Sequence, residues 1–271
     1  MRWLGEIKVF GSEQGFIQSR FLLRLAYTSL GEFRYPLRFR WILLRRSLPK
    51  DFFPKVVWDA GCGEGQTSFW LSKHFPNARI IGTDIKEENV EYCEHITRYL
   101  KRSNTTFISK DVIEGVPQVV DLIVCFEVLE HIENYGNALQ SFSDSLVPGG
   151  YLMIHAPAAN SFQSGTWGLR RFVHPEIKTT SLHDQGQYHV RPGFNLEELA
   201  GEIENLGFHV LKKNYTFGFI AMFAHTIYEW TRSRSKIWQI VTLWPLLGLS
   251  YLDMWISFPI GGGVLIVAQK Q

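Results

Sequence analysis

Cysteine is scarce in this sequence, and the few that occur exclude a disulfide-stabilised scaffold. The chain has three cysteines, Cys62, Cys93 and Cys125, in 271 residues, and no two of them form a CxxC pair. An odd number of cysteines without metal-ligand spacing argues against both a disulfide framework and a zinc site. We therefore expect free thiols, no bound metal and a reducing, cytoplasmic environment.

An excess of charge of one sign is also missing. The chain has 28 basic and 26 acidic residues and a net charge of +2, so we expect no uniform polyanion-binding surface and no nucleic-acid partner. The balance is uneven, because residues 16–50 contain eight arginines and lysines but one acid, Glu32. This segment predicts a basic amphipathic helix that packs on the core, forms a lid, or contacts anionic lipid heads or phosphates.

No apolar run is long enough to cross a bilayer. Residues 215–258 are rich in aromatic side chains, but their longest uncharged stretch, 237–252, has 16 residues and contains Pro245, whereas a spanning helix needs about 20. This segment predicts a helical insertion that caps the domain or touches a membrane interface. Residues 1–16 carry charges and glycines where an export signal has an apolar stretch. We expect a cytoplasmic protein, free or peripherally bound to a membrane.

Short apolar runs alternate with segments of helical period from residue 55 onward. Strands are predicted over 55–60, 78–85, 105–111, 119–127 and 150–157, then from 208 and over 261–270. Helices are predicted over 66–74, 87–102, 135–146 and 195–206, with a turn at 146–150 and a long loop over 158–194. Repeated βα units predict a Rossmann-like, doubly wound α/β fold. We divide the chain into a helical N-terminal segment, 1–54, and a domain, 55–271, with the aromatic insertion 215–258.

A glycine-rich loop joins the first predicted strand to the first helix. It reads Asp-Ala-Gly-Cys-Gly-Glu-Gly over residues 59–65. Glycines at such a turn let the backbone approach a ligand, and free N–H groups at the helix start favour polar or anionic groups. Asp84 closes the second strand, where a carboxylate can accept from ribose hydroxyls. The spacing is GxGxG rather than the GxGxxG of dinucleotide enzymes, and Asp59 before it suits a positive ligand group, such as the ammonium of a methionine moiety.

With these motifs and the Glu-Val-Leu-Glu-His stretch after the fourth predicted strand, the chain resembles the class I S-adenosylmethionine-dependent methyltransferases. The resemblance covers residues 56–210 and is strongest to the small-molecule, ubiquinone-biosynthesis-like group. It implies S-adenosylmethionine as cofactor and a mostly parallel, seven-stranded sheet with an antiparallel final strand. The residues that it implies for the cofactor are Asp59, Ala60, Gly61, Cys62, Gly63, Gly65, Asp84, Ile85, Asp111, Val112, Phe126 and Glu127.

The resemblance also places Glu130 and His131 at the methyl acceptor. Our hypothesis is that His131, with His189 or Arg191, orients or deprotonates the acceptor; for His131 the alternative is a capping role. The flanking basic and aromatic segments favour a small or lipid-like acceptor with an anionic portion, methylated on oxygen, nitrogen or carbon. Two other functions stay open, namely a protein that binds the cofactor without methyl transfer and a nicotinamide-dependent oxidoreductase.

Overall fold

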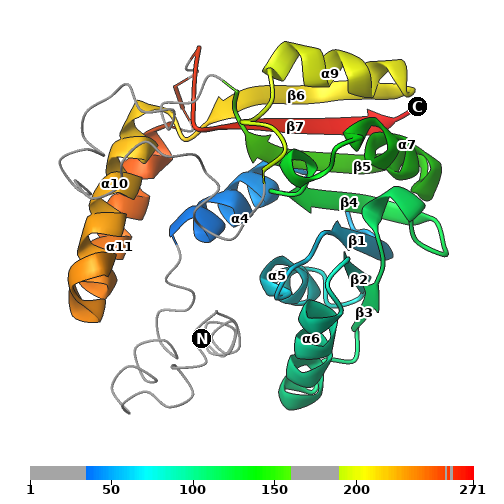
Figure 1. Ribbon diagram of the computed structural model, residues 1–271, viewed down its shortest axis with the longest axis horizontal. Coiled ribbons are helices and arrows are strands. Elements are labelled where there is room, and N and C mark those ends of the chain that lie inside the picture. Colours follow the sequence, from blue (N-terminus) through cyan, green and yellow to red (C-terminus); the bar gives the residue numbers. More distant parts are fainter. Residues whose placement is uncertain (1–34, 160–188, 254, 257–258) are drawn as a thin grey trace.

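The architecture is a seven-stranded sheet with helices on both faces. The computed structural model describes residues 35–159, 189–253, 255–256 and 259–271 (Figure 1). The first part of the basic helix expected over residues 16–50, up to residue 34, and most of the loop expected over 158–194 lie outside this description. Among the described residues no helix is long and apolar enough to span a bilayer.

The sheet has the order β3-β2-β1-β4-β5-β7-β6. The strands are β1 Val56–Ala60, β2 Arg79–Asp84, β3 Thr105–Ser109, β4 Val120–Phe126, β5 Leu146–Pro157, β6 Phe208–Thr216 and β7 Gly263–Lys270. β7 runs antiparallel to both β5 and β6, and the other pairs are parallel. The predicted doubly wound fold with an antiparallel final strand is therefore confirmed.

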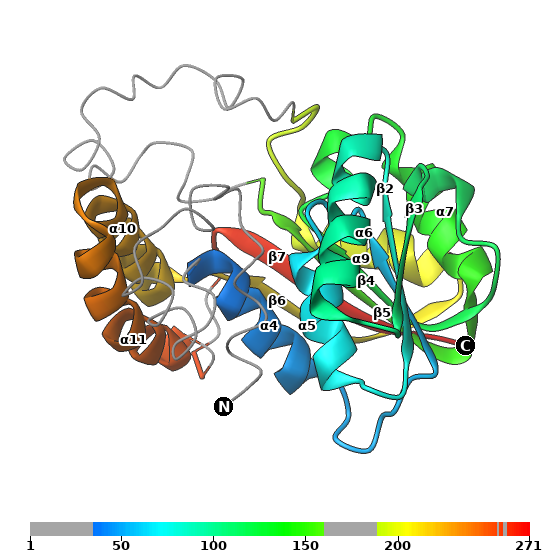
Figure 2. The ribbon, with the colours of Figure 1, turned by 90° about the horizontal axis from the view of Figure 1, so that it is seen from below.

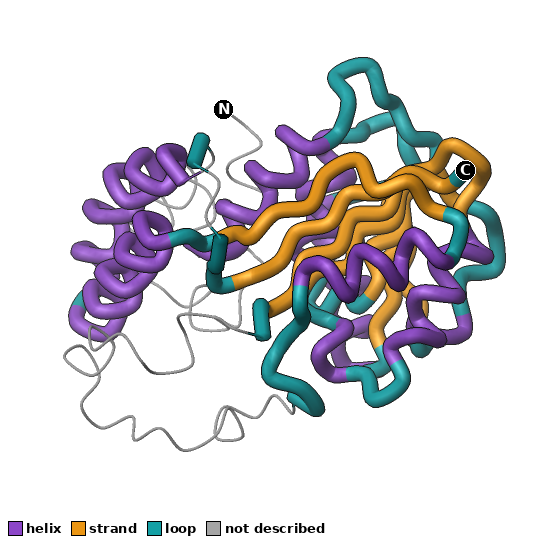
Figure 3. Tube along the Cα trace, turned by 90° about the horizontal axis from the view of Figure 1, so that it is seen from above, coloured by secondary structure: helices purple, strands orange, loops and turns teal. Residues whose placement is uncertain are grey.

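Two apolar layers sandwich this sheet, and Figure 3 shows the twisted strands with helices to either side. The helices that flank it are α4 Tyr35–Ser47, α5 Gln66–His74, α6 Glu87–Leu100, α7 Tyr135–Ser145 and α9 Leu196–Asn205. In β4, Leu122 and Val124 belong to the layer that contains α4 and α5, whereas Ile123 belongs to the layer with α7 and α9. Because both faces are buried, the central strands are continuously apolar, as the sequence pattern predicted.

The fifth strand begins earlier than expected. The turn predicted at 146–150 is wrong in part, because β5 starts at Leu146, which already pairs with Val120 of β4. The register then shifts before Leu122 pairs with Tyr151. Gly149, with a φ of 79°, absorbs part of this irregularity, since only glycine adopts that backbone angle without cost.

A helical hairpin follows β6, as the aromatic insertion predicted. It consists of α10 Phe219–Arg234 and α11 Lys236–Asp253, and it starts slightly later than predicted because β6 continues to Thr216. Figures 1 and 2 place the hairpin beyond the end of the sheet, next to α4. The Tyr35 hydroxyl of α4 donates to the Ala221 carbonyl at 3.1 Å and also contacts the Ser250 hydroxyl. The hairpin and α4 are thereby joined by buried polar and aromatic contacts.

Candidate active site at the carboxyl edge of the sheet

Four parallel strands bring the predicted site residues to one edge. β1, β2, β3 and β4 all end at the same side of the sheet, so the segments that follow their last residues converge. Ligands of open α/β sheets bind at this carboxyl edge, beside the point where the strand order reverses. In this sheet that point lies between β1 and β4.

The glycine-rich loop is closely folded against its neighbours. Gly61, Gly63 and Gly65 have φ angles of 72°, 53° and 78°, which disfavour residues with a side chain. A Cβ atom on Gly61 would lie 2.4 Å from the Val128 side chain, whereas one on Gly63 would meet nothing within 4 Å. The Cys62 N–H donates to the Thr83 carbonyl at 2.8 Å, which ties the loop to the end of β2. The loop therefore exposes open space at Gly63, where a ligand can approach the backbone.

Asp84 is fixed beside that opening. Its Oδ2 accepts the Gly63 N–H at 2.9 Å, and its Oδ1 accepts the Lys86 N–H at 2.9 Å and the Asn89 Nδ2 at 3.0 Å. A carboxylate has about four acceptor positions, so about one stays free for a ligand hydroxyl. Ile85, which follows, is 69% exposed and offers apolar surface next to the carboxylate. This combination of a fixed acceptor and an apolar face fits a nucleoside.

Asp59 differs from Asp84 because it is buried. It lies at the penultimate position of β1, before the buried Ala60, and its Oδ2 accepts the Ser68 hydroxyl at 2.5 Å. Burial raises the pKa of Asp59 to about 7, and the hydrogen bonds from Ser68 offset only part of this shift. A cationic group brought to the loop would favour the ionised form.

The acid predicted after the third strand has a local role. Asp111 precedes the short 3₁₀ helix Val112–Glu114, and its Oδ1 accepts the Ile113 N–H at 3.1 Å. Val112 itself is buried. The structure thus uses Asp111 to cap this turn, and Ile113 is the exposed apolar residue beside it.

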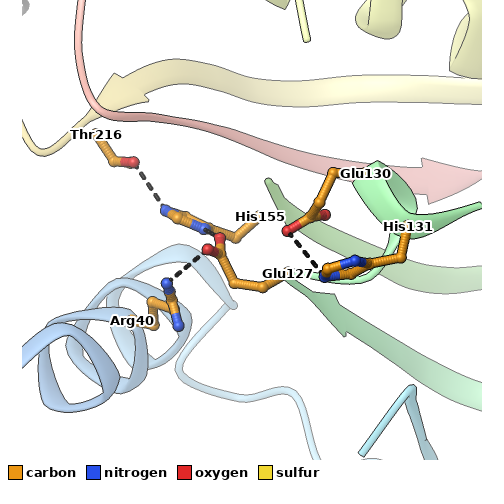
Figure 4. A network of polar contacts seen from close by, with 6 residues as sticks. All are labelled: Arg40, Glu127, Glu130, His131, His155 and Thr216. Atoms are coloured by element: carbon orange, nitrogen blue, oxygen red, sulfur yellow. Dashed lines mark hydrogen bonds and ion pairs between the residues drawn. The ribbon is translucent and has the colours of Figure 1, made fainter. Parts of the chain in front are cut away.

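Glu127 directly follows β4, and its carboxylate lies in a polar network (Figure 4). Its Oε2 pairs with the Arg40 guanidinium at 2.9 Å, and its Oε1 lies 2.8 Å from His155 Nδ1. His155 Nε2 lies 2.8 Å from the Thr216 hydroxyl. Burial tends to raise the pKa of Glu127, but Arg40 and His155 outweigh it and lower the pKa to about 2. The network joins α4, β4, β5 and β6 at the carboxyl edge, next to Phe126 at the end of β4.

The backbone at Glu127 is unusual for a residue with a side chain. Its φ is 56°, in the left-handed region that favours glycine. Its N–H donates to the His155 carbonyl at 2.9 Å, so both backbone and side chain are attached to His155. Conformations of this kind cost about 1–3 kcal/mol and gather at functional sites.

Glu130 and His131 lie in the short 3₁₀ helix Leu129–His131 after β4, and they form a cluster with His189. Their nitrogen and oxygen ligand atoms all lie within 4.8 Å of one another, a set that could hold a metal ion. Glu130 is fully buried, and neither carboxylate oxygen has a hydrogen-bond partner among the described residues. The nearest approach is from His131 Nε2, 4.0 Å from Oε1. Burial and the neighbouring Glu127 raise the pKa of Glu130 well above its usual range, which favours a protonated carboxyl group.

The Arg191 side chain binds neighbouring groups of the protein. Its Nη2 donates to the carbonyls of Ile132 and Glu133 at 2.7 Å each, and the guanidinium stacks over the Tyr135 ring at 4.3 Å. The Val190 N–H donates to the Glu130 carbonyl at 3.0 Å. The described end of the loop, from His189 onward, is thereby attached to the segment after β4, and this brings His189 to His131.

The comparisons with known proteins agree with this geometry. A family model described as a methyltransferase domain matches residues 54–204, more than half of the chain. The chain belongs to this methyltransferase-domain family. The match begins just before β1 and ends within α9, so it includes the carboxyl-edge residues from Asp59 to His131.

Relatives of this methyltransferase domain act on different atoms. A ubiquinone biosynthesis O-methyltransferase of Vibrio cholerae is 26% identical over 162 residues, which cover 58% of this chain and 62% of the relative. An (S)-coclaurine N-methyltransferase of Thalictrum flavum is 25% identical over 99 residues, 36% of this chain and 27% of the relative. The chain thus spans under two thirds of the length of these curated relatives.

A solved structure shares the fold of the methyltransferase domain. An O-methyltransferase from a polyketide synthase multienzyme of Brevibacillus brevis, in complex with S-adenosyl-L-homocysteine, superposes with a TM-score of 0.56. It is 17% identical, and the match covers 92% of this chain and 76% of that one.

Several residues that complete the site were not predicted from the sequence. Asn89 and Ser68 hold the two aspartates, and Arg40, His155 and Thr216 hold Glu127. Arg40 lies in the basic segment 16–50, and nothing in that segment indicates its partner. His155 lies in the fifth predicted strand, 150–157, and no motif there indicates its contact with Glu127.

Proposed function

We propose that this protein transfers a methyl group from S-adenosylmethionine to a small, amphipathic acceptor. The observation that carries the proposal is the glycine loop with its open side at Gly63 and Asp84 held beside it. This geometry belongs to a chain of the methyltransferase-domain family. The O- and N-methyltransferases among its relatives leave the acceptor atom open.

The residues at the carboxyl edge fit this cofactor. Asp84 would accept a ribose hydroxyl at its remaining position, and the exposed Ile85 would lie against the adenine. The backbone of Gly61 to Gly65 would border the methionine portion, with the Asp59 carboxylate near its ammonium group. When bound, S-adenosylmethionine supplies an electrophilic methyl group on a sulfonium. The protein's own task is then to align the acceptor and to exclude water.

The Glu130–His131–His189 cluster is the proposed place of the acceptor. A hydroxyl acceptor needs a base, and His131 would take its proton, because a neutral imidazole accepts at one ring nitrogen. Burial and the proximity of His131 lower the pKa of His189, which favours the neutral form of His189. Protonated Glu130 would donate to an imidazole nitrogen or to the acceptor. Arg191 acts as a positioning residue that holds this loop in place.

A peripheral position at a membrane completes the proposal. The basic helix α4 reaches the carboxyl edge through Arg40, and the aromatic hairpin begins shortly after Thr216, the last residue of β6, whose hydroxyl contacts His155. An acceptor with an apolar body and an anionic portion suits such surroundings.

Calorimetric titration with S-adenosylmethionine and S-adenosylhomocysteine tests the cofactor assignment. We expect wild-type binding in the micromolar range and a loss of about tenfold to a hundredfold in Asp84→Asn, because a charge-assisted hydrogen bond is removed. The exposed Glu88→Gln serves as the matched control and should bind as wild type does. A folded wild-type protein that binds neither compound would contradict the proposal.

The acceptor role is tested separately. In an assay with extracted methyl acceptors, His131→Ala should lower turnover by about a hundredfold or more while the affinity for S-adenosylhomocysteine is retained. His209→Ala, on the exposed side of β6, is the control. Equal turnover in His131→Ala and in the control would exclude His131 as the base.

A further inference from the structure

One face of α11 is apolar and exposed. Trp238, Val241, Trp244, Tyr251 and Leu252 recur at helical spacing, and they are all 41% to 60% exposed. The intervening positions 243, 246, 247 and 250 are buried against the protein. None of the exposed side chains described on this helix is charged. The hairpin therefore has an inner face that packs and an outer face of large apolar residues, which is unusual for a helix at a protein surface.

The apolar face continues beyond α11. Trp255 is 77% exposed, and Ile256 and Ile260 follow it at the surface. On α10, Phe223 and Trp230 are also exposed. We call these residues of α10, α11 and 255–260, together with those of the preceding paragraph, the hairpin face.

Arginines stand beside its tryptophans. The Arg38 guanidinium lies 4.7 Å from the centre of the Trp244 ring, and that of Arg46 lies 5.0 Å from Trp255. Both arginines belong to α4, whose sequence has four arginines and no acid. Figure 2 shows α4 next to the hairpin. A surface of tryptophan, tyrosine and arginine is typical of groups that sit at the boundary between lipid tails and headgroups.

A small cationic hollow adjoins the hairpin face. It has a volume of about 180 Å³ and lies between α4, β6 and the segment after α11, with Trp255 and Ile256 in its wall. Arg46 and Lys212 are its cations, and burial together with Arg46 lowers the pKa of Lys212. Asp253 also lines it, but its carboxylate accepts the Ile220 and Ala221 N–H groups at the start of α10. The hollow has the size and charge for a phosphate group.

We propose that the hairpin face docks on an anionic lipid bilayer, with its aromatic residues among the acyl chains and a lipid phosphate at Arg46 and Lys212. No described helix could span the bilayer, so the hairpin lies along the surface. A second copy of the chain fits this face less well, because a two-fold contact would place each arginine-rich α4 near the other. This inference rests on one part of the proposed function, namely that the protein acts at a membrane.

Vesicle co-sedimentation of the full chain tests this surface. We expect binding to vesicles of phosphatidylcholine with phosphatidylglycerol, and weaker binding to phosphatidylcholine alone. The double variant Trp238→Ser/Trp244→Ser should bind at least roughly tenfold more weakly, because two large apolar side chains no longer leave water on binding. Arg46→Gln/Lys212→Gln should lose roughly 30-fold on anionic vesicles only, since each cation near such a surface contributes about 1 kcal/mol, or about fivefold. Added salt should likewise weaken the binding of the wild-type protein to anionic vesicles.

Phe53→Ser is the matched control. Phe53 is 81% exposed but precedes β1, at the opposite edge of the sheet, so this variant should bind as wild type does. An unchanged melting temperature and an unchanged affinity for S-adenosylhomocysteine would show that the variants are folded. Because this affinity reports on the proposed function and vesicle binding reports on the hairpin face, the two proposals can fail separately. Wild-type protein that stays in solution with anionic vesicles would overturn the inference. So would a wild-type dimer, seen by light scattering, that the double tryptophan variant converts to a monomer.

Discussion

At the residue scale, the two aspartates of the proposed cofactor site differ in their environment. Asp84 is held by three donors at the surface of the loop, whereas Asp59 is buried with a pKa raised from 3.8 to about 7. Because the folded state favours protonated Asp59, the stability that this group contributes is present below about pH 4 and is lost as the pH rises to about 7. Binding of an ammonium group reverses this preference.

We predict that the affinity for S-adenosylhomocysteine rises with pH up to about 7 and then levels off. Below that value the change should approach tenfold per pH unit, because the ionised carboxylate of Asp59 is the form that pairs with the ammonium group. Asp59→Asn should remove this dependence, bind more weakly at pH 8 and melt at a higher temperature there. Calorimetry and thermal unfolding between pH 6 and 8 measure both effects. The exposed Asp144→Asn is the control, and a pH dependence that survives in Asp59→Asn would count against the assignment.

Gly63 offers a second prediction at this scale. Alanine there meets no atom within 4 Å, so Gly63→Ala should fold, with a loss of about 1–2 kcal/mol from its left-handed backbone. The added methyl group points into the space proposed for the cofactor, so binding should fall at least about tenfold. Gly201→Ala in α9 has equal room and an ordinary helical backbone, and it should gain up to about 1 kcal/mol without changing binding. Equal binding by the two variants would show that the opening at Gly63 is not the cofactor side.

At the element scale, the network around Glu127 connects four elements that are distant in sequence. We predict that Glu127→Gln is destabilised by about 1–3 kcal/mol at pH 7, because Arg40 keeps its charge and loses its partner. The pKa of Glu127 is lowered from 4.5 to about 2, so its stabilising effect is present above about pH 4.5 and is lost as the pH falls to about 2.

The difference between wild type and Glu127→Gln should therefore shrink over that window, as urea unfolding at a series of pH values can measure. Lys213→Gln breaks the exposed pair with Glu197 and should leave stability unchanged throughout. A difference that stays constant down to pH 2 would mean that the carboxylate charge is not what stabilises the network.

This network also marks the limit of prediction from the sequence. The strands and the glycine loop follow from local patterns, since apolar period, turn residues and spacing are properties of neighbouring residues. The contact of Arg40 with Glu127 depends on how α4 packs on the finished sheet, and the early start of β5 depends on a register shift beside Val120. Neither leaves a local trace. Glu130 and His131 were expected together from one motif, but His189 reaches them through the loop that Arg191 fastens.

At the scale of the whole molecule, two segments from different parts of the chain meet at one edge. α4 precedes the sheet and the hairpin interrupts it between β6 and β7, yet both belong to the same buried cluster, and α4 also reaches Glu127 through Arg40. Figure 1 places the hairpin beyond the end of the sheet, with α4 beside it.

Enzymes of other classes that bind nucleotides share this fold. The change in melting temperature that each ligand causes therefore distinguishes between the possible functions. We predict that S-adenosylhomocysteine at about a hundred times its dissociation constant raises the melting temperature by roughly 5–8 °C, since it contributes about 2.7 kcal/mol to the folded state. NADH at the same concentration should give no shift, because the spacing is GxGxG rather than GxGxxG and the Asp59 carboxylate before the loop suits a positive group better than a pyrophosphate. Asp84→Asn should lose at least about half of the shift. A shift with NADH instead would move the protein to the oxidoreductases, whereas a shift with S-adenosylhomocysteine but no turnover of any acceptor would favour a protein that binds the cofactor without methyl transfer.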